Sequence, residues 1–272
     1  MPTGDLTLQQ AADHLGVHYM TAYRYVKLGL LYAEKQRGSW MISPTDLAAF
    51  EGTSLEANPT DANLEEALVS GDEATAWTVI EQAIERLDNP VDVQLEILAP
   101  ALVSIGKRWA DGELSIASEH KASAVATRII ARLAQRVAAP GRRRGTVIVG
   151  AAPGDVHSIP SAMFAELIRS FGVSVIDLGA SPEVDSFSEA VLRHEEAVVA
   201  ISLTGPGHEA GARAAVDAVR AADPDIPIAV GGGAIRSERE ARDLGASIWH
   251  DDVRVAAKQI ADAAADRRQH AG

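Results

Sequence analysis

An aspartate and a histidine two residues apart, Asp155 and His157, are residue types that can do chemistry together. They follow a run of small and β-branched residues, 146–152, and precede an apolar segment with helical spacing, 161–171. This order predicts strand, loop and helix, and such loops form the ligand crevice of open α/β sheets. There the carboxylate can take the Nδ1 proton of the imidazole, which leaves Nε2 free to bind a metal. Taken alone, the triplet favours a salt-bridged histidine at the surface.

Two later strand ends change that balance. Ser202 and Thr204 follow the apolar run 197–201, and the triplet Gly231–Gly233 follows the run 226–230. A hydroxyl can hydrogen-bond the nitrogen of a buried heterocycle. Glycines let the backbone approach a large flat ligand closely. Together with the first loop, these strand ends favour a ligand site.

The elements that would position these side chains alternate between strand and helix patterns. The expected strands cover residues 146–152, 173–179, 197–202, 226–230 and 246–249. The alternation predicts an α/β domain at 146–272 with a doubly wound, Rossmann-like parallel sheet. The glycine run lacks the Gly-x-Gly-x-x-Gly spacing of dinucleotide-binding loops, and no Walker lysine is present.

This set of residues resembles the cobalamin-binding domain, whose pattern is Asp-x-His-x-x-Gly, then Ser-x-Leu, then Gly-Gly. The matching positions are Asp155, His157, Ser202, Gly231 and Gly232. The resemblance implies that His157 is the lower cobalt ligand, that Asp155 orients it, and that Ser202 bonds the dimethylbenzimidazole. It also implies cofactor contacts for Val156, Ser158, Ile159, Thr204 and Gly233. Pro160 stands where the family has glycine, and Thr204 where it usually has leucine.

Residues 62–140 are expected to form a four-helix bundle. Apolar residues recur with helical spacing from 64 to 139, with a kink expected at Pro100 and a break at Gly112. The last long helix is expected at 115–137.

Trp109 lies just before this break, and Glu119-His120 follows after nine further residues. In a bundle seen alone, a core tryptophan and a solvated polar pair would be the simpler interpretation. Beside a cobalamin-like domain, the spacing resembles the Trp-x9-Glu-His signature of CarH-type photoreceptors. The resemblance implies that Trp109 packs against a 5′-deoxyadenosyl upper ligand, and that Glu119 and His120 contact the ligand or the corrin edge. The family's second histidine, directly after the tryptophan, is Ala110 here, which excludes a bis-histidine photoproduct through that position.

The N-terminal segment, residues 1–53, has the pattern of two short helices around a glycine-containing turn, then a β-hairpin and a third helix. This order resembles MerR-type and excisionase-type winged helix-turn-helix domains. The implied DNA-binding residues are Tyr19, Thr21, Tyr23, Arg24 and Lys27 on the second helix, with Arg37 on the wing. The alternative is a small protein-binding module, because residues 1–51 hold four basic and five acidic residues. The order of motifs favours DNA, and the low charge favours dimers or higher assemblies on repeated half-sites.

The 272 residues suit two or three domains, here joined by linkers expected at 54–61 and 141–145. A net charge of −13 argues against indiscriminate nucleic-acid binding, although one local DNA-binding face stays compatible with it. The chain has no cysteine, no visible signal peptide and no apolar run long enough to cross a bilayer. We therefore expect a cytoplasmic protein without a membrane segment.

The three parts in this order predict a cobalamin-dependent, light-responsive transcriptional regulator and not an enzyme. The expected ligand is adenosylcobalamin, with methylcobalamin or hydroxocobalamin as alternatives. The expected partners are operator DNA and further copies of the chain, as a dimer or tetramer. One rival interpretation is a corrinoid protein that carries methyl groups between methyltransferases, and another is a repressor that senses cobalamin without light.

Overall fold

The structure is a computed structural model, and it describes residues 5–15, 19–27, 31–36, 39–52, 59–137, 144–194 and 197–270. Within these ranges the side chains of Met20, Thr21, Arg24, Lys27, Gln36, Ala49, Glu51, Gly52, Pro59, Thr60, Asp61 and Ala62 are not described. The chain divides into two compact units, Met1–Asn63 and Leu64–Gly272. The boundaries of the three domains expected from the sequence stay a prediction. In the described part of the chain, no helix is long and apolar enough to span a membrane.

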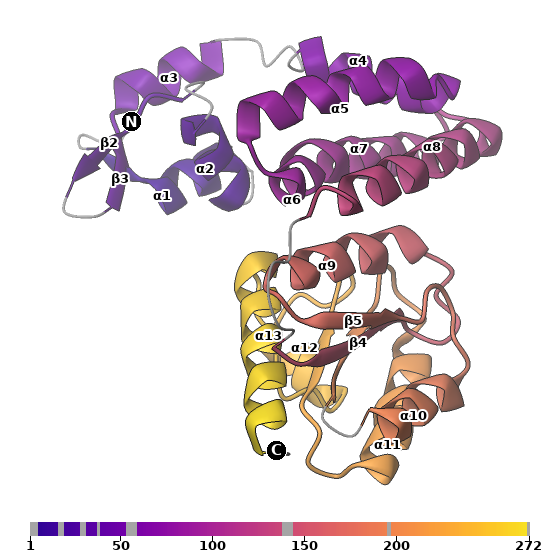
Figure 1. The fold of residues 1–272 in the computed structure, drawn as a ribbon. Helices are drawn as coiled ribbons and strands as arrows, with labels where there is room; N and C mark the ends of the chain where they lie inside the picture. The colour runs from indigo at the N-terminus through magenta and orange to yellow at the C-terminus, as the bar shows by residue number, and fades with distance from the viewer. Residues whose placement is uncertain are drawn as a thin grey trace. The chain divides into compact units, whose positions relative to one another are not determined.

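The N-terminal unit contains two short helices, a small antiparallel sheet and a third helix (Figure 1). These elements are β1 (Leu6–Thr7), α1 (Leu8–Leu15), α2 (Tyr19–Lys27), β2 (Glu34–Gln36), β3 (Ser39–Ile42) and α3 (Pro44–Gly52). The sheet order is β1-β3-β2. The α3 helix starts as the sequence predicts, because the Ser43 hydroxyl accepts the Asp46 N–H and Pro44 needs no partner for a missing N–H. The rings of Tyr25 and Phe50 pack 4.9 Å apart and join α2 to α3.

The second unit begins with a helical domain. Its elements are α4 (Pro59–Ser70), α5 (Glu73–Leu87), α6 (Pro90–Val93), a π-helical turn η1 (Gln94–Leu98), α7 (Ala99–Ala110) and α8 (Ile116–Ala134). Side-chain caps begin α5, α6 and α8, at Asp72, Asn89 and Ser115. Leu64, Ile80, Leu98 and Ile129 are among the fully buried side chains of its core.

The expected kink at Pro100 takes the form of the π-helical turn just before it. Pro100 has no N–H to donate to the carbonyl four residues earlier, and its ring would clash with that carbonyl. The helix widens instead, and the Ala99 N–H bonds to the Gln94 carbonyl, five residues back.

The rest of the unit is an α/β domain, which confirms the predicted parallel sheet. Its elements are β4 (Thr146–Ala151), α9 (Ser158–Ser170), β5 (Ser174–Asp177), α10 (Val184–Arg193), β6 (Ala197–Ser202), α11 (Glu209–Ala222), β7 (Ile228–Gly231), α12 (Glu238–Asp243) and α13 (Val253–His270). The strand order is β5-β4-β6-β7, and all pairs are parallel. Alternate strand residues face the α9 and α13 side or the α10 and α11 side, so both faces of the sheet are buried.

The prediction of a fifth strand at residues 246–249 is wrong. Only a single bridge joins Ile248 to Ala229. The Ser247 hydroxyl accepts the N–H of Ile228, so a side chain occupies a donor that a longer ladder would use. Beyond this point the chain turns, and the Asp252 carboxylate accepts the N–H groups of Arg254 and Val255 at the start of α13.

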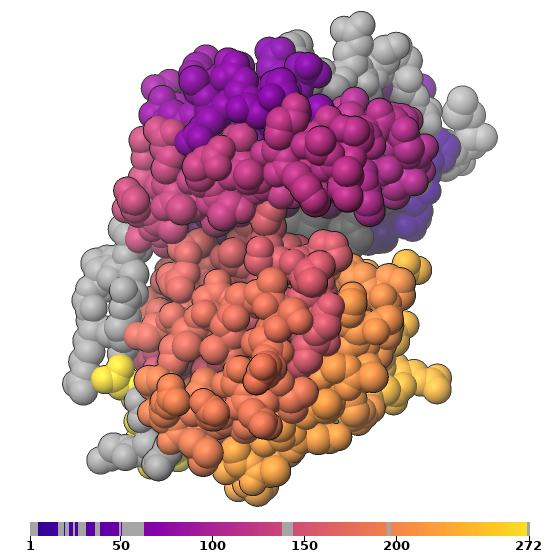
Figure 2. All heavy atoms as spheres, turned by 90° about the vertical axis from the view of Figure 1, so that its right-hand side faces the viewer, coloured from indigo at the N-terminus to yellow at the C-terminus, as the bar shows by residue number. Residues whose placement is uncertain are grey.

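Helix α9 is shared between the helical domain and the sheet. Met163 belongs to the core of the helical domain, whereas Ala165 and Ile168 belong to the core between the sheet and α13. Arg254 adds a second connection, because its guanidinium binds Asp92 on α6 and Glu96 on η1. In Figure 2 the helical domain accordingly lies directly on the α/β domain.

Candidate functional site

Asp155 is the most constrained side chain of the site. It is fully buried and accepts three hydrogen bonds from N–H groups. Its Oδ1 lies 3.0 Å from the His157 backbone nitrogen and 2.6 Å from His157 Nδ1, and its Oδ2 lies 2.8 Å from the Thr204 nitrogen. The carboxylate therefore joins the loop after β4 to the loop after β6.

The loop that carries Asp155 has a defined backbone. Gly154 has φ +91°, a left-handed conformation that glycine adopts without strain, and its N–H donates to the Ser181 hydroxyl. The Asp155 carbonyl in turn accepts the N–H of Ser181. These bonds explain why the carboxylate can be buried without losing its orientation.

Burial raises the pKa of Asp155, but the hydrogen bonds from Thr204 and His157 outweigh it, so the pKa lies below its usual value. The group is therefore an anion near neutral pH. An anion 2.6 Å from Nδ1 places the imidazole proton on Nδ1. The neutral His157 ring then has Nε2 free as an acceptor or metal ligand.

His157 is the residue before α9, and its side chain is 55% exposed. The neighbouring Val156 is 73% exposed. Pro160 occupies the first turn of α9, where the missing N–H costs no hydrogen bond. The residue that departs from the expected glycine thus fits the helix start.

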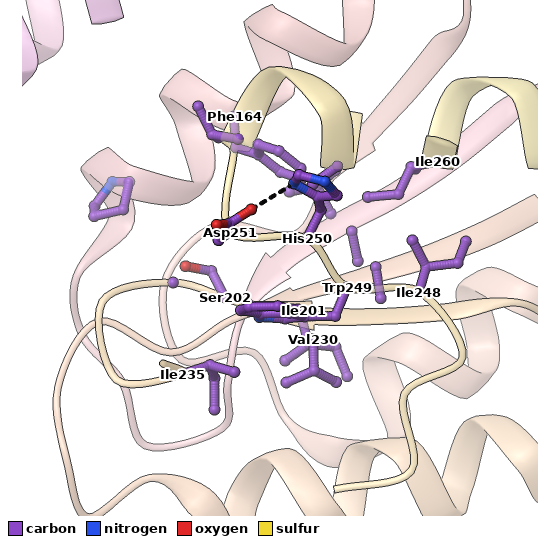
Figure 3. A pocket seen from close by; sticks show the side chains of 18 residues that line it. Phe164, Ile201, Ser202, Val230, Ile235, Ile248, Trp249, His250, Asp251 and Ile260 are labelled. Carbon is purple, nitrogen blue, oxygen red and sulfur yellow. Dashed lines mark ion pairs between the residues drawn. The ribbon is translucent and has the colours of Figure 1, made fainter. Parts of the chain in front are cut away.

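A cavity of about 310 Å³ opens beside this loop, at the small end of the usual range for ligand pockets (Figure 3). Its walls come from the carboxyl-terminal parts of β4, β6 and β7, from α9, from α13 and from the segment that leads into α13. They include Ser202, Gly231 and Gly232 among otherwise mainly apolar side chains such as Phe164 and Ile235. The hydroxyl of Ser202 makes no hydrogen bond to another described residue.

Two further features mark this edge of the sheet. Gly232 has φ +105°, and a Cβ there would lie 2.3 Å from the Leu203 carbonyl oxygen, so no other residue fits. The Thr204 Oγ1 is buried and has no hydrogen-bond partner among the described residues. Gly233 lies against this loop, since a Cβ there would lie 3.1 Å from the Thr204 carbonyl oxygen.

On the helical domain, Glu119 and His120 form a second carboxylate–imidazole pair near the start of α8. Glu119 Oε2 lies 2.7 Å from His120 Nδ1, and Glu119 Oε1 accepts the Ser123 hydroxyl at 2.6 Å. Burial raises the pKa of Glu119, but the hydrogen bonds from Ser123 and His120 outweigh it and leave the pKa below its usual value. The His157 imidazole contributes to this lowering.

Trp109 lies at the end of α7 with 45% of its surface exposed. The structure describes no hydrogen bond or ring contact between Trp109 and either Glu119 or His120. Val103 on α7 and Ile116 on α8 are also large apolar side chains that face solvent, at 73% and 59%.

Sequence reasoning missed several residues of the pocket. Phe164 had no separate role within its apolar helix. Trp249 ends the segment 246–249 that was expected to be a strand, and His250, Asp251 and Val253 follow that segment. The rule that strand ends carry ligand groups would have found three of them, because Trp249 to Asp251 come directly after the Ile248 bridge. Ser158 and Ile159 begin α9, and Ile159 packs against the core of the helical domain.

The expected DNA-binding residues are only partly described. Tyr19 is 38% exposed at the start of α2, and Tyr23 is half-buried against the core of the N-terminal unit. The side chains of Thr21, Arg24 and Lys27 lie outside the described part of the structure, as does Arg37 altogether.

Three family models match the chain. A helix-turn-helix domain matches residues 6–51, one B12 binding domain matches residues 61–134, and a second matches residues 145–261. The chain carries a helix-turn-helix domain followed by two B12 binding domains. The second B12 binding domain contains the Asp155 loop and most of the pocket, and the first contains Trp109 and the Glu119–His120 pair.

Relatives of two kinds match this chain. The HTH-type transcriptional repressor CarH of Myxococcus xanthus is 28% identical over 197 residues, which cover 70% of this chain and 64% of that protein. The trimethylamine corrinoid protein of Methanosarcina barkeri is 27% identical over 146 residues, 52% of this chain and 66% of that protein. The chain thus matches slightly less than two thirds of the length of each.

The structure of the monomethylamine corrinoid protein of Methanosarcina barkeri has the same fold over 73% of this chain and 95% of that chain, with a TM-score of 0.64 and 17% identity. Among the described residues, no group of three or more His, Asp or Glu side chains could hold a metal ion by itself.

Proposed function

We propose that the protein is a cobalamin-dependent, light-responsive transcriptional regulator. The observation that carries the proposal is the His157 ring, which the buried Asp155 orients with Nε2 free, next to a mainly apolar pocket that contains the Ser202 hydroxyl. A single free imidazole nitrogen suits a metal whose other ligands come from a macrocycle. The adjacent pocket suits a flat heterocycle.

The residues of the α/β domain fit the lower side of a cobalamin. His157 would be the lower cobalt ligand, and Asp155 would fix its tautomer and orientation. Ser202 would donate to the nitrogen of the dimethylbenzimidazole in the pocket. Val156, Ser158 and Ile159, together with Gly231, Gly232 and Gly233, would border the cofactor. The buried Thr204 hydroxyl, which has no hydrogen-bond partner in the described part of the chain, supports a ligand at this edge, since a buried polar atom without a partner is costly.

The residues of the helical domain would cover the upper side. Trp109 would pack against the upper ligand, and Glu119 and His120 would contact that ligand or the corrin edge. Exposed Val103, Ile116 and Val156 are further apolar surface that a corrin can cover. When bound, adenosylcobalamin supplies a cobalt–carbon bond that visible light can break.

Ala110 sets a limit on the lit state. A histidine at this position would bind cobalt after light, and alanine has no such atom. After loss of the upper ligand, water or another histidine would take that place, and His120 on the same domain could do so.

The N-terminal unit would bind operator DNA through α2. Arg24 and Lys27 would contact phosphate or base edges, and Tyr19, Thr21 and Tyr23 complete the proposed face, with Arg37 on the hairpin. Binding as a dimer or tetramer would compensate for the low basic charge of a single copy. Loss of the upper ligand would shift the helical domain and change this assembly.

The rival function is a corrinoid methyl carrier, and the similarity to the trimethylamine corrinoid protein favours it. The helix-turn-helix domain argues against it, because a methyl carrier has no need to bind DNA. Trp109 also argues against it, since a bulky side chain over the upper ligand hinders methyl transfer.

The proposal is tested by adding adenosylcobalamin in the dark and recording the absorption spectrum, the molecular mass by size exclusion and the affinity for operator DNA, before and after green light. We expect all three to change together. His157→Ala should alter the absorption spectrum. Arg24→Ala should reduce the affinity for DNA and leave the absorption spectrum unchanged. Photolysis with no change in mass or DNA affinity would point to the light-independent sensor or the methyl carrier. Unchanged affinity and spectrum in His157→Ala would contradict the ligand assignment.

A further inference from the structure

One wall of the pocket is a short segment that lies beyond the last pairing of the sheet. At its start, a single bridge joins Ile248 to Ala229 on β7. Residues 249–252 all belong to the described part of the chain, and none of them is in a strand or a helix. Four residues of this segment and of the start of α13 line the pocket, namely Trp249, His250, Asp251 and Val253 (Figure 3). The position of this wall therefore depends on what holds its other end, where α13 begins.

Arg254 joins that other end to the helical domain. Its guanidinium binds Asp92 on α6 and Glu96 on η1, with 2.9 Å between Arg254 Nη2 and Glu96 Oε1. Asp92 and Glu96 are four positions apart along the helical stretch from α6 into η1, so both carboxylates lie on one face and can bind one guanidinium. We call Arg254, Asp92 and Glu96 the clamp.

The clamp can transmit a movement between the pocket wall and the helical domain. The side chains of Arg254, Asp92 and Glu96 are 32%, 28% and 33% exposed, so solvent screens these ion pairs less than pairs at the open surface. Arg254 follows Val253 directly, and the Asp252 carboxylate accepts the backbone N–H of Arg254 at 2.7 Å. Arg254 thus belongs to the same turn as the pocket wall, so a shift of the wall moves the guanidinium against its two carboxylates.

We infer that Arg254 is a positioning residue that couples occupation of the nucleotide pocket to docking of the helical domain on the α/β domain. A nucleotide base in the pocket holds the wall in place and keeps the clamp closed. Because coupling between two sites is reciprocal, movement of the helical domain away from the α/β domain opens the clamp and weakens binding of the nucleotide. This inference rests on the proposed function, since it assumes that a corrinoid nucleotide occupies the pocket.

Two corrinoids separate the contribution of the pocket from that of the corrin ring. Cobalamin carries a nucleotide, whereas cobinamide has the corrin ring and lacks the nucleotide. Dissociation constants for both are measured in the dark by spectroscopic titration of the full chain. The variants are Arg254→Gln, which removes the charge, and Asp92→Asn, which removes one carboxylate. Arg267→Gln is the matched control, because Arg267 is also on α13 and binds Asp223 within the α/β domain.

We expect Arg254→Gln to weaken cobalamin binding about fivefold, at the lower end of the usual coupling between two sites, and to leave cobinamide binding unchanged. Asp92→Asn should weaken cobalamin binding less, because Glu96 still binds the guanidinium. The double variant should bind cobalamin no more weakly than Arg254→Gln alone, since both changes break the same clamp. Arg267→Gln should leave the ratio of the two dissociation constants unchanged.

Amide hydrogen exchange measures the same coupling from the side of the helical domain. Cobalamin should slow exchange in α6 and η1 of the wild-type chain more than cobinamide does, because only cobalamin closes the clamp. Arg254→Gln should abolish this difference between the two corrinoids.

Equal losses of affinity for cobalamin and cobinamide in Arg254→Gln, or no loss for either, overturn the inference while the proposed function stands. A loss of the same size and selectivity in Arg267→Gln also overturns it, because the effect then does not come from the contact with the helical domain. If Arg254→Gln does not fold, Asp92→Asn decides, and a ratio of dissociation constants equal to that of the wild type overturns the inference. A wild-type chain that does not bind cobalamin overturns both.

Discussion

Two carboxylate–imidazole pairs, one in the α/β domain and one in the helical domain, are built differently. In the α/β domain, Asp155 is fully buried and accepts three N–H groups, two of them from the backbone. In the helical domain, Glu119 is held by the Ser123 hydroxyl and by His120, whose side chain is 71% exposed. The carboxylate-to-Nδ1 distances are nearly the same, 2.6 and 2.7 Å.

The two carboxylates differ in how firmly their hydrogen-bond donors are held. The donors to Asp155 are fixed by two strand-end loops, so its imidazole has one orientation. The donors to Glu119 are side chains that can rotate into water. Under the proposed function the site would keep its lower ligand and release its upper one, and the Asp155 and Glu119 pairs would supply a rigid side and an adaptable side for these two roles.

Replacement of Asp155, the rigid carboxylate, should have the largest effect on the free energy of unfolding. In Asp155→Asn, one amide oxygen can still accept from His157, but the amide NH₂ then faces the Thr204 N–H and two donors meet without an acceptor. We expect the free energy of unfolding to fall by about 1–3 kcal/mol in urea titrations at neutral pH.

The matched control is Asp177→Asn. Asp177 also accepts a loop N–H, from Gly179, but its side chain is exposed and water can replace the bond. Its change should stay within about 0.5 kcal/mol. Equal effects of the two variants would show that burial of Asp155 has no energetic consequence.

Low pH should reduce the contribution of Asp155 to the free energy of unfolding. The folded-state pKa of Asp155 lies below its unfolded value, so the unfolded chain binds this proton more readily. The stabilisation is therefore complete above the unfolded pKa of about 3.9 and is lost as the pH falls through the folded pKa. The stability difference between wild type and Asp155→Asn, measured by urea titration, should be constant from pH 7 to 5 and shrink below about pH 4. A difference that shrinks already near pH 6 would implicate a histidine instead.

Replacement of Glu119, the adaptable carboxylate, should have the smallest effect on the free energy of unfolding. In Glu119→Gln the amide oxygen can still accept the Ser123 hydroxyl, and exposed His120 can turn to water. We expect the unfolding free energy without cofactor to change by less than about 0.5 kcal/mol. A loss as large as that of Asp155→Asn would remove the distinction between the two sides.

The rigid side was easier to predict from the sequence than the adaptable one. Asp155, Ser202 and Gly232 follow apolar runs that are recognisable as buried strands, and the parallel sheet brings such ends to one edge. The hydrogen bond from Thr204 to Asp155 spans 49 positions and depends on the fold, so no local pattern indicates it. His250 directly follows the segment 246–249 that was expected to be a strand, so the rule that strand ends carry ligand groups indicates it, although no motif marks it.

Helix α9 has a consequence for anyone who would cut this protein into parts. It supplies Met163 to the core of the helical domain and Ile168 to that of the α/β domain, although the sequence boundary between the two B12 binding domains lies before it. A fragment that ends at residue 140 would lack Met163 in its core, and one that starts there would expose it. The two domains thus form one structural unit, and a functional chimera has to exchange them together from Leu64 onward.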